Sequence, residues 1–215
     1  MNNARSAILA RLTQVARPLM DSQGRDYLSR YDWTLDERIQ RFSERMQAVR
    51  AEIHVANRST WLDTLADICQ QKGLNNLLYA PNTVLGQKIS AQAQRFPKAL
   101  DYAQPIELWK DELFHQVDAA FTATDGGIAE TGSLILMPNS DEPRLMSLVP
   151  PIHIALLDTA KLYSTFAEAI QAQGWVQHGM PTNALLISGP SKSADIEQTL
   201  AYGVHGPKEL VVILV

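Results

Sequence analysis

The 215-residue sequence contains a single cysteine, Cys69. No disulfide can form within the chain, and an iron–sulfur cluster, which several cysteine thiolates hold, cannot be bound by this chain alone. Cys69 lies among apolar residues of a predicted helix over residues 59–71, where a free cysteine usually behaves as a small buried hydrophobe. The sequence therefore excludes a disulfide scaffold and predicts no cofactor of this kind on the chain itself.

Long apolar runs and metal-ligand patterns are also missing. No apolar stretch approaches the roughly 18 residues that a membrane-spanning helix needs, and the first residues lack the apolar core of a signal peptide. We therefore expect a cytoplasmic protein without a membrane span. No His-x-x-x-His spacing or carboxylate cluster predicts a metal site.

Charge is unevenly distributed along the chain. The net charge of −4 gives no reason to expect a nucleic-acid partner. Residues 1–58 hold ten Arg, no Lys and seven Asp or Glu, a formal charge of +3, which leaves −7 on the remainder. With helical periodicity over residues 4–17 and 35–50, this contrast predicts an N-terminal helical segment over 1–50 that docks or oligomerises. Its apolar stripe packs either on the body of this chain or on a second copy in a homodimer.

Residues 51–215 alternate between short apolar strands and amphipathic helices. Strands are predicted over 53–56, 77–80, 117–122, 134–137, 152–157, 184–188 and 210–215. Helices are predicted over 59–71, 83–96, 111–116, 161–173 and 195–201, and extended chain over 99–108 and 145–149. This alternation predicts an α/β domain, an open and mostly parallel sheet with helices on both faces. Ligands of such sheets bind beyond the carboxyl ends of the strands.

The glycine-rich stretch 124–133 precedes an apolar strand and is expected to form a tight turn. Glu130 within it is a candidate catalytic nucleophile or general base, because burial and nearby amides can adjust a carboxylate for either task. Alternatively, Glu130 only accepts backbone N–H bonds and braces the turn. The neighbouring Thr131 and Gly132 are candidate substrate-binding residues.

A second candidate site is the loop after the strand at 184–188. Ser188, Gly189, Ser191 and Lys192 precede a predicted helix, and helix N-termini bind anions through free N–H groups. The glycine spacing is not that of a Walker loop. Acidic residues in the predicted first turn already complement the helix dipole, so a well-capped helix without a ligand is the alternative.

Three further residues complete the set of candidates. Arg144 is the only arginine after Arg95, and it could hold a small carboxylic acid bidentately or pair with Glu130. His153 lies inside an apolar strand, where a lone histidine is more often a hydrogen-bonded core residue than a ligand. His205 lies in the turn Gly-Val-His-Gly-Pro before the last strand, and its accessible ring makes it the better acid/base candidate.

Several of these motifs together resemble the LUD-domain family. The shared blocks are Ala-Glu-Thr-Gly at 129–132, the segment from Arg144 to His153, Ile-Ser-Gly-Pro-Ser at 187–191, Ala-Asp-Ile-Glu at 194–197 and Gly-Val-His-Gly-Pro at 203–207. The likeness covers about residues 50–215. It implies a fold similar to the sugar-phosphate isomerase and coenzyme A transferase superfamily.

The resemblance also implies a role in the oxidation of L-lactate to pyruvate beside partner proteins that carry iron–sulfur clusters. This chain would then be an accessory subunit without a cluster, one that binds, assembles or regulates rather than catalyses. The alternative is a free-standing enzyme or binding protein for an acyl, sugar-phosphate or folate-like molecule that uses Glu130. In coenzyme A transferases of this fold the nucleophile lies in a Glu-Asn-Gly setting, whereas Thr131 stands here in place of the Asn.

Overall fold

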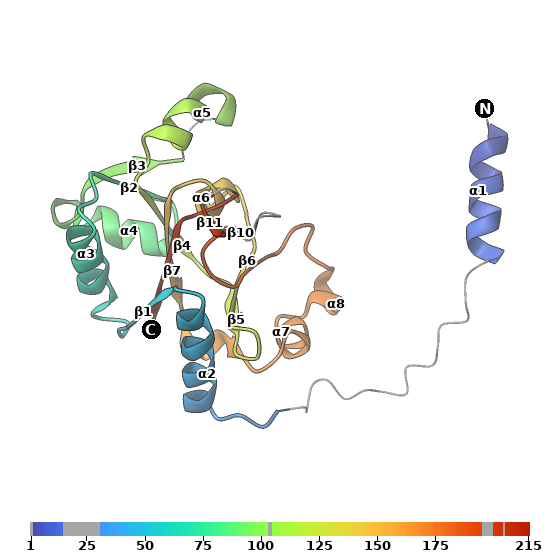
Figure 1. Cartoon of the computed structure of the whole chain (residues 1–215), viewed down its shortest axis with the longest axis horizontal. Helices are drawn as coiled ribbons and strands as arrows, with labels where there is room; N and C mark the ends of the chain where they lie inside the picture. Colours follow the sequence, from blue (N-terminus) through green and yellow to red (C-terminus); the bar gives the residue numbers. More distant parts are fainter. Residues whose placement is uncertain (1, 15–30, 103–104, 195–199, 204) are drawn as a thin grey trace.

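A six-stranded sheet, in which all described pairings are parallel, forms the centre of the chain (Figure 1). The computed structural model describes residues 2–14, 31–102, 105–194, 200–203 and 205–215. The strands in spatial order are β1 (Glu52–Val55), β12 (Glu209–Leu214), β7 (Ile152–Leu157), β4 (Ala119–Ala123), β2 (Asn76–Tyr79) and β3 (Lys98–Asp101). This order confirms the predicted open α/β sheet, and it places the last strand of the chain between β1 and β7.

A second, smaller sheet covers one face of the first. Its strands in spatial order are β8 (Leu162–Tyr163), β5 (Gly126–Ile128), β6 (Ser133–Leu136) and β9 (Leu185–Ile187), and β6 is antiparallel to both of its neighbours. Leu134 and Leu136 of β6 join a core cluster with Ala155 and Val212 of the central sheet. The two sheets therefore bury one shared apolar layer.

The glycine-rich stretch contributes strand β5 to this sheet, so the prediction of a simple turn over residues 124–133 is wrong for residues 126–128. A Cβ atom on Gly127 would lie 2.9 Å from a methyl of Leu157 and 3.0 Å from one of Leu162. Glycine is needed here because the strand packs too closely on its neighbours for a side chain. The turn itself is confined to the residues between β5 and β6.

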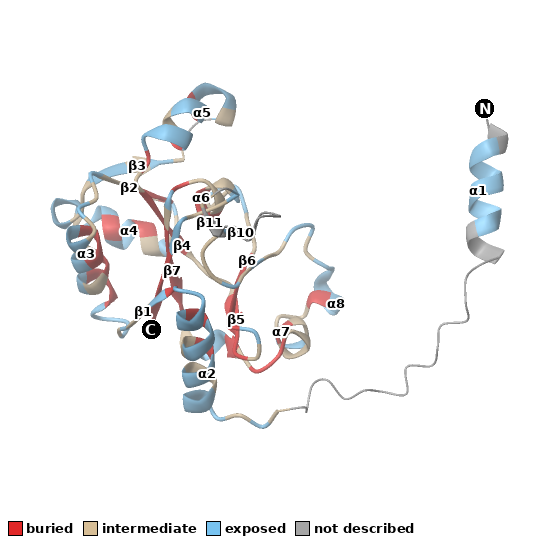
Figure 2. Ribbon diagram, in the orientation of Figure 1, coloured by how far each residue is buried: buried red, intermediate tan, exposed pale blue. Residues whose placement is uncertain are grey.

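Helices α3 (Trp61–Gln71) and α4 (Val84–Ser90) cover the opposite face of the central sheet (Figure 1). Trp61 stacks on Phe121 of β4 with 5.6 Å between ring centroids, and Ile89 of α4 joins the same core cluster. Figure 2 shows the consequence, with buried residues along the central strands and exposed ones on the outer sides of the helices. Burial of aromatic and aliphatic side chains at about 25 cal/mol per Å² is the main stabilising contribution of this layer.

Four further helices pack on the two sheets, and they are α5 (Ile106–His115), α6 (Leu145–Leu148), α7 (Phe166–Ala172) and α8 (Trp175–His178). Trp109 of α5 and Met146 of α6 pack near β2 and β4, while Ala169 of α7 and Trp175 of α8 lie against the second sheet. The chain also contains the 3-10 turns η1 (Ala93–Arg95) and η2 (Thr159–Lys161), and the antiparallel pair of strands β10 (Lys192–Ala194) and β11 (Leu200–Tyr202).

Several predicted segments differ from the structure. The helix predicted over 161–173 is wrong for Leu162 and Tyr163, which form strand β8, and helix α7 begins only at Phe166. Residues 106–108 begin helix α5 rather than continuing an extended chain, because Pro105 suits the start of a helix. Residues 145–149 contain the short helix α6 instead of extended chain. Leu200 and Ala201 pair with β10 in strand β11, so the helix predicted over 195–201 is wrong for them, and residues 195–199 lie outside the described residues.

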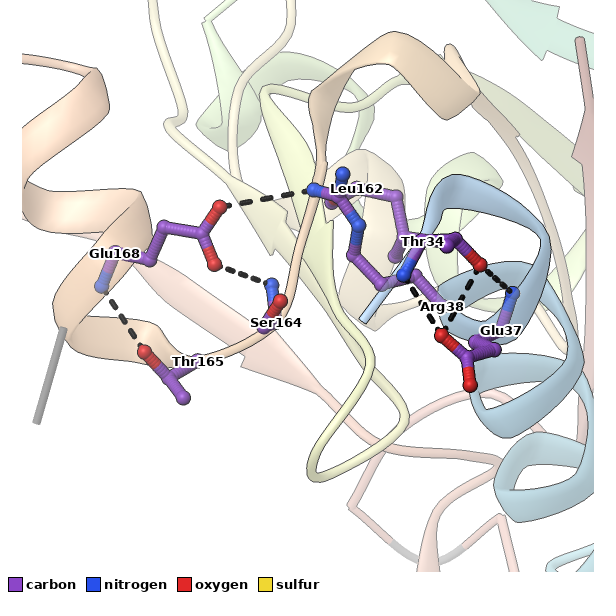
Figure 3. Close-up of polar contacts among 7 residues, drawn as sticks. All are labelled: Thr34, Glu37, Arg38, Leu162, Ser164, Thr165 and Glu168. Carbon is purple, nitrogen blue, oxygen red and sulfur yellow. Dashed lines mark hydrogen bonds and ion pairs between the residues drawn. The ribbon is translucent and has the colours of Figure 1, made fainter. Parts of the chain in front are cut away.

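The second N-terminal helix is part of the body of the chain. Helix α2 (Leu35–Ala48) begins with a capping box, in which the Thr34 hydroxyl accepts the Glu37 N–H and the Glu37 carboxylate accepts the Thr34 N–H (Figure 3). Phe42 and Met46 are fully buried in the core cluster between the two sheets. Ile39, Phe42 and Met46 of the predicted apolar stripe therefore pack on the body of this chain, while Leu35 and Val49 at its two ends are exposed.

Arg38 fastens α2 to the second sheet and to α7. Its guanidinium donates to the Leu162 carbonyl at 2.7 Å and lies 3.6 Å from the Glu168 carboxylate (Figure 3). Glu168 in turn accepts the Ser164 N–H at 2.7 Å, and its own N–H is capped by Thr165. This charged contact fixes the orientation of α2 against the apolar surface that the buried side of the same helix covers.

The first N-terminal helix differs from α2 in its burial. Helix α1 (Asn2–Gln14) exposes residues 4–11, among them Ile8 and Leu9. The predicted homodimer stays a prediction, and exposed apolar residues occur both in α1 and, at Leu35, in α2. None of the helices within the described ranges has the length and apolarity needed to cross a bilayer.

Truncation of Phe42 tests the docking of α2. We expect Phe42→Ala to lower the free energy of unfolding by about 3–5 kcal/mol, because it opens a cavity between the sheets. The matched control is Gln47→Ala on the exposed side of the same helix, with an expected change within about 0.5 kcal/mol. Urea unfolding measures both, and equal small losses would show that α2 is not docked on the body in solution.

Candidate functional site

A cavity of about 180 Å³ brings two of the sequence motifs together. Its lining includes four of the predicted site residues, which are Ser188, Gly189, Ser191 and His205. The loop after β9 and the loop before β12 are joined by two backbone hydrogen bonds, from the Ser191 N–H to the Pro207 carbonyl and from the Gly203 N–H to the Ser191 carbonyl. The two loops therefore form one wall.

The other wall comes from the central sheet and from α6. His153 is the second residue of β7 and is the register partner of Leu210, the second residue of β12. The cavity thus lies at the amino ends of these two parallel strands and not at their carboxyl ends, where the fold class led us to expect a ligand site. The reason is that the enclosing loops lead into β12 instead of following a strand of the central sheet.

His153 is the most unusual residue of this site. Its side chain is fully buried, and Nε2 lies 2.9 Å from the Thr122 hydroxyl of β4. Nδ1 has no hydrogen-bond partner among the described residues. Burial lowers the pKa of the imidazole from 6.5 to about 4, so the ring is neutral at neutral pH. The sequence ranked His153 below His205, because a single histidine between two isoleucines has the pattern of a core residue.

A chain of hydroxyl groups leads from the surface to the cavity. The Thr131 hydroxyl lies 2.7 Å from the Ser133 hydroxyl, which lies 2.7 Å from the Ser188 hydroxyl. Thr131 is exposed, Ser133 is buried, and Ser188 lines the cavity. The antiparallel pairing of β6 with β9 sets this contact, since Leu134 is opposite Ile187. Ser133 was missed in the sequence, because its partner becomes apparent only from that pairing.

Glu130 does not line this cavity. Its carboxylate accepts the Tyr31 hydroxyl at 3.2 Å, and its N–H donates to the Ser164 carbonyl at 3.0 Å. Tyr31 is itself stacked on Trp33, with 4.0 Å between ring centroids. These contacts support the bracing role for Glu130, which links the segment before α2 to the β5–β6 turn. Its role as a catalytic residue stays a prediction.

Gly132 also serves this turn. It has φ +63°, a left-handed conformation that favours glycine, and an added Cβ would meet the side chain of Arg45 in α2. The conformation and the close approach of α2 both account for the glycine without a ligand. Its predicted role in substrate binding stays a prediction.

Arg144 and Lys192 lie outside the cavity. Arg144 is exposed and borders a separate small pocket of about 20 Å³ together with Asp125 and Glu142. Burial, with the charges of Asp125 and Asp141, raises the pKa of the Glu142 carboxyl, against the hydrogen bond that it accepts from the Ala123 N–H. Lys192 is exposed at the start of β10, and the start of the helix predicted over 195–201 lies outside the described residues.

The positions of the described His, Cys, Asp and Glu side chains bear on metal binding and on thiol reactivity. Within the described ranges, no three His, Cys, Asp or Glu side chains lie close enough together to hold a metal ion. Cys69 is buried on the opposite face of the central sheet, and burial raises the pKa of its thiol to about 11. Its thiolate form is therefore rare at neutral pH, unlike that of a reactive cysteine.

Comparison with known families places the chain. The family description "LUD domain" matches residues 39–215. The chain belongs to the LUD-domain family. The matched region starts inside α2 and includes both sheets and every residue that lines the cavity. The fold is that of a DUF162 family protein from Deinococcus radiodurans, whose crystal structure superposes with a TM-score of 0.62, 23% identity and coverage of 85% of this chain and 99% of the other.

The share of each relative's own length that this LUD domain matches differs between relatives. An uncharacterized protein of Neisseria meningitidis serogroup B is 40% identical over 99% of this chain and 94% of its own length. Lactate utilization protein C of a Geobacillus strain is 32% identical over 73% of this chain and 61% of its own. That of Macrococcus caseolyticus is 34% identical over 48% and 46%. The similarity to these two lactate utilization proteins thus spans about half to three fifths of their length.

The neutral state of His153 gives this LUD domain a pH-dependent stability. The folded-state pKa of about 4 lies below the ordinary value of 6.5, so the unfolded chain binds a proton first as the pH falls. The contribution of the neutral imidazole to the free energy of unfolding is present above pH 6.5 and is lost between about pH 6.5 and pH 4. From about pH 7.5 to about pH 5 we expect a loss of about 2 kcal/mol from this residue.

Urea unfolding at the two pH values measures this loss. His153→Gln should remove it, and His178→Gln, at an exposed histidine in α8, should keep the pH dependence of the unchanged chain. The same pH dependence in all three proteins would contradict the assignment to His153.

Proposed function

We propose that this LUD domain takes part in lactate utilisation, as a cytoplasmic accessory subunit of an iron–sulfur system that oxidises L-lactate to pyruvate. The observation that supports the proposal best is the cavity in which the Ser-Gly-Pro-Ser loop and the Gly-Val-His-Gly-Pro loop meet. The names of several relatives, lactate utilization protein C, supply the metabolic context. In this proposal the cavity holds a small carboxylate.

The cysteine content determines the division of roles within the proposed system. A cluster is held by several thiolates, whereas this chain has one cysteine, buried in the core. Electrons taken from lactate would therefore pass through clusters on partner subunits. This chain would contribute binding of the acid, assembly or regulation.

A free-standing enzyme that uses Glu130 on an acyl, sugar-phosphate or folate-like substrate is the alternative. A nucleophile must reach the substrate, and the candidate cavity is lined without Glu130. The bond from Tyr31 and the position of Glu130 in a packing turn favour the accessory role instead.

Growth on lactate tests the proposal. Deletion of the gene in its own organism should slow or abolish growth on L-lactate as the carbon source and leave growth on glucose unchanged. The wild-type gene should restore growth, and affinity purification from lactate-grown cells should recover partners with the absorption spectrum of iron–sulfur clusters.

Two complementation variants sharpen this test. His205→Gln alters the cavity lining, and His178→Gln changes an exposed histidine outside it. We expect impaired growth on lactate with the first and normal growth with the second, at equal protein levels. Normal growth of the deletion strain on L-lactate would refute the proposal.

A further inference from the structure

The lining of the cavity restricts the chemistry of its ligand. Its described polar side chains are two histidines and the hydroxyls of Ser147, Ser188 and Ser191, and the remainder is apolar or glycine. No Asp, Glu, Lys or Arg is among these described lining residues. A multiply charged group such as a phosphate ester would therefore enter without a compensating charge, which is unfavourable.

The volume restricts the size of the ligand. Pockets for drug-sized molecules measure about 300–1,000 Å³, and this cavity has about 180 Å³. A nucleotide or a folate is too large to be enclosed. An acid of a few carbon atoms fits, and Leu186, Ile187 and Leu210 offer its hydrocarbon part an apolar surface.

The two histidines differ in burial, and this difference favours one orientation of a ligand in the cavity. His153 is a fully buried residue of the wall, and among the described residues its Nδ1 lacks a partner. A ligand oxygen that reached this nitrogen would supply the missing hydrogen bond. His205 is exposed, so a charged group beside it keeps its contact with water. A matching ligand has an uncharged oxygen at one end and its charge at the other.

We infer that the cavity binds a short-chain 2-hydroxy or 2-oxo monocarboxylate, with the 2-oxygen at His153 and the carboxylate directed toward His205. The inference rests on the proposed function for the choice of three-carbon acids as probes. It adds that this chain itself binds the acid and that His153 recognises the oxygen on which oxidation of a 2-hydroxy acid takes place.

Calorimetric titration of the full chain with matched acids tests the inference. L-lactate and pyruvate are compared with propionate, which has the same carbon chain and carboxylate but no 2-oxygen, and with inorganic phosphate. We expect L-lactate or pyruvate to bind at least about tenfold more tightly than propionate, because propionate leaves Nδ1 unpaired. Phosphate should bind more weakly still.

Two substitutions of His153 separate its nitrogens. A glutamine side chain reaches about as far as Nε2 and can keep the bond to Thr122, whereas an asparagine places a polar atom near Nδ1. His153→Gln should therefore lose the preference for L-lactate or pyruvate over propionate, and His153→Asn should keep part of it. His178→Gln is the control and should bind like the unchanged chain.

Each result decides the inference. Equal affinities for propionate and the oxygenated acids, no binding below about 10 mM, or tightest binding of phosphate would overturn it. An unchanged preference in a folded His153→Gln variant would overturn the role of His153. If the variants do not fold, the comparison of acids on the unchanged chain still decides.

The outcome can be distinguished from failure of the proposed function. Loss of growth on lactate after deletion, without binding of these acids, leaves the proposed function standing and refutes the inference. Selective binding of these acids, together with normal growth of the deletion strain on L-lactate, refutes the proposed function and leaves the inference standing.

Discussion

The parallel pairing of β12 with β7 is the contact on which the candidate site depends. It sets Leu210 beside His153, and it draws the preceding loop against the start of β7, where the Lys208 N–H donates to the Pro151 carbonyl. The same loop is bonded to Ser191 through Pro207. Because β12 is the last strand in sequence and lies between β1 and β7, the cavity forms only when distant parts of the chain have paired.

The sequence predicted the parts of the fold whose local pattern leaves one interpretation. The apolar runs at 152–157 and 210–215 are strands β7 and β12, since continuous apolar residues suit a parallel sheet that is buried on both faces. It also predicted correctly that helix α2 forms. It failed at residues 126–128 and 200–201, because glycines that allow close packing resemble a turn, and the strand pairing of Leu200 and Ala201 with β10 overrides their helical pattern.

The candidate site was predictable only where its motifs lie in loops. Ser188, Gly189, Ser191 and His205 occur in glycine-containing segments of a kind that often binds ligands, and the structure brings these four together. His153, Thr122 and Ser133 lie in strands, where a polar residue gives no sign of its partner until the neighbouring strand is known. Glu130 lies outside this cavity, and a carboxylate two residues before a glycine has the same local pattern in a packing turn as in an active site, so its catalytic role stays a prediction.

The composition of the cavity bears on what this chain can contribute to an oxidation. Conversion of a 2-hydroxy acid to a 2-oxo acid removes two electrons and two protons. Hydroxyl and imidazole groups exchange protons but do not oxidise an alcohol, and the described side chains of the cavity are of these kinds or apolar. A neutral, buried imidazole can hold the oxygen of the acid without a charge of its own. The electrons therefore need an acceptor other than these side chains, and the proposed function assigns that acceptor to a partner subunit.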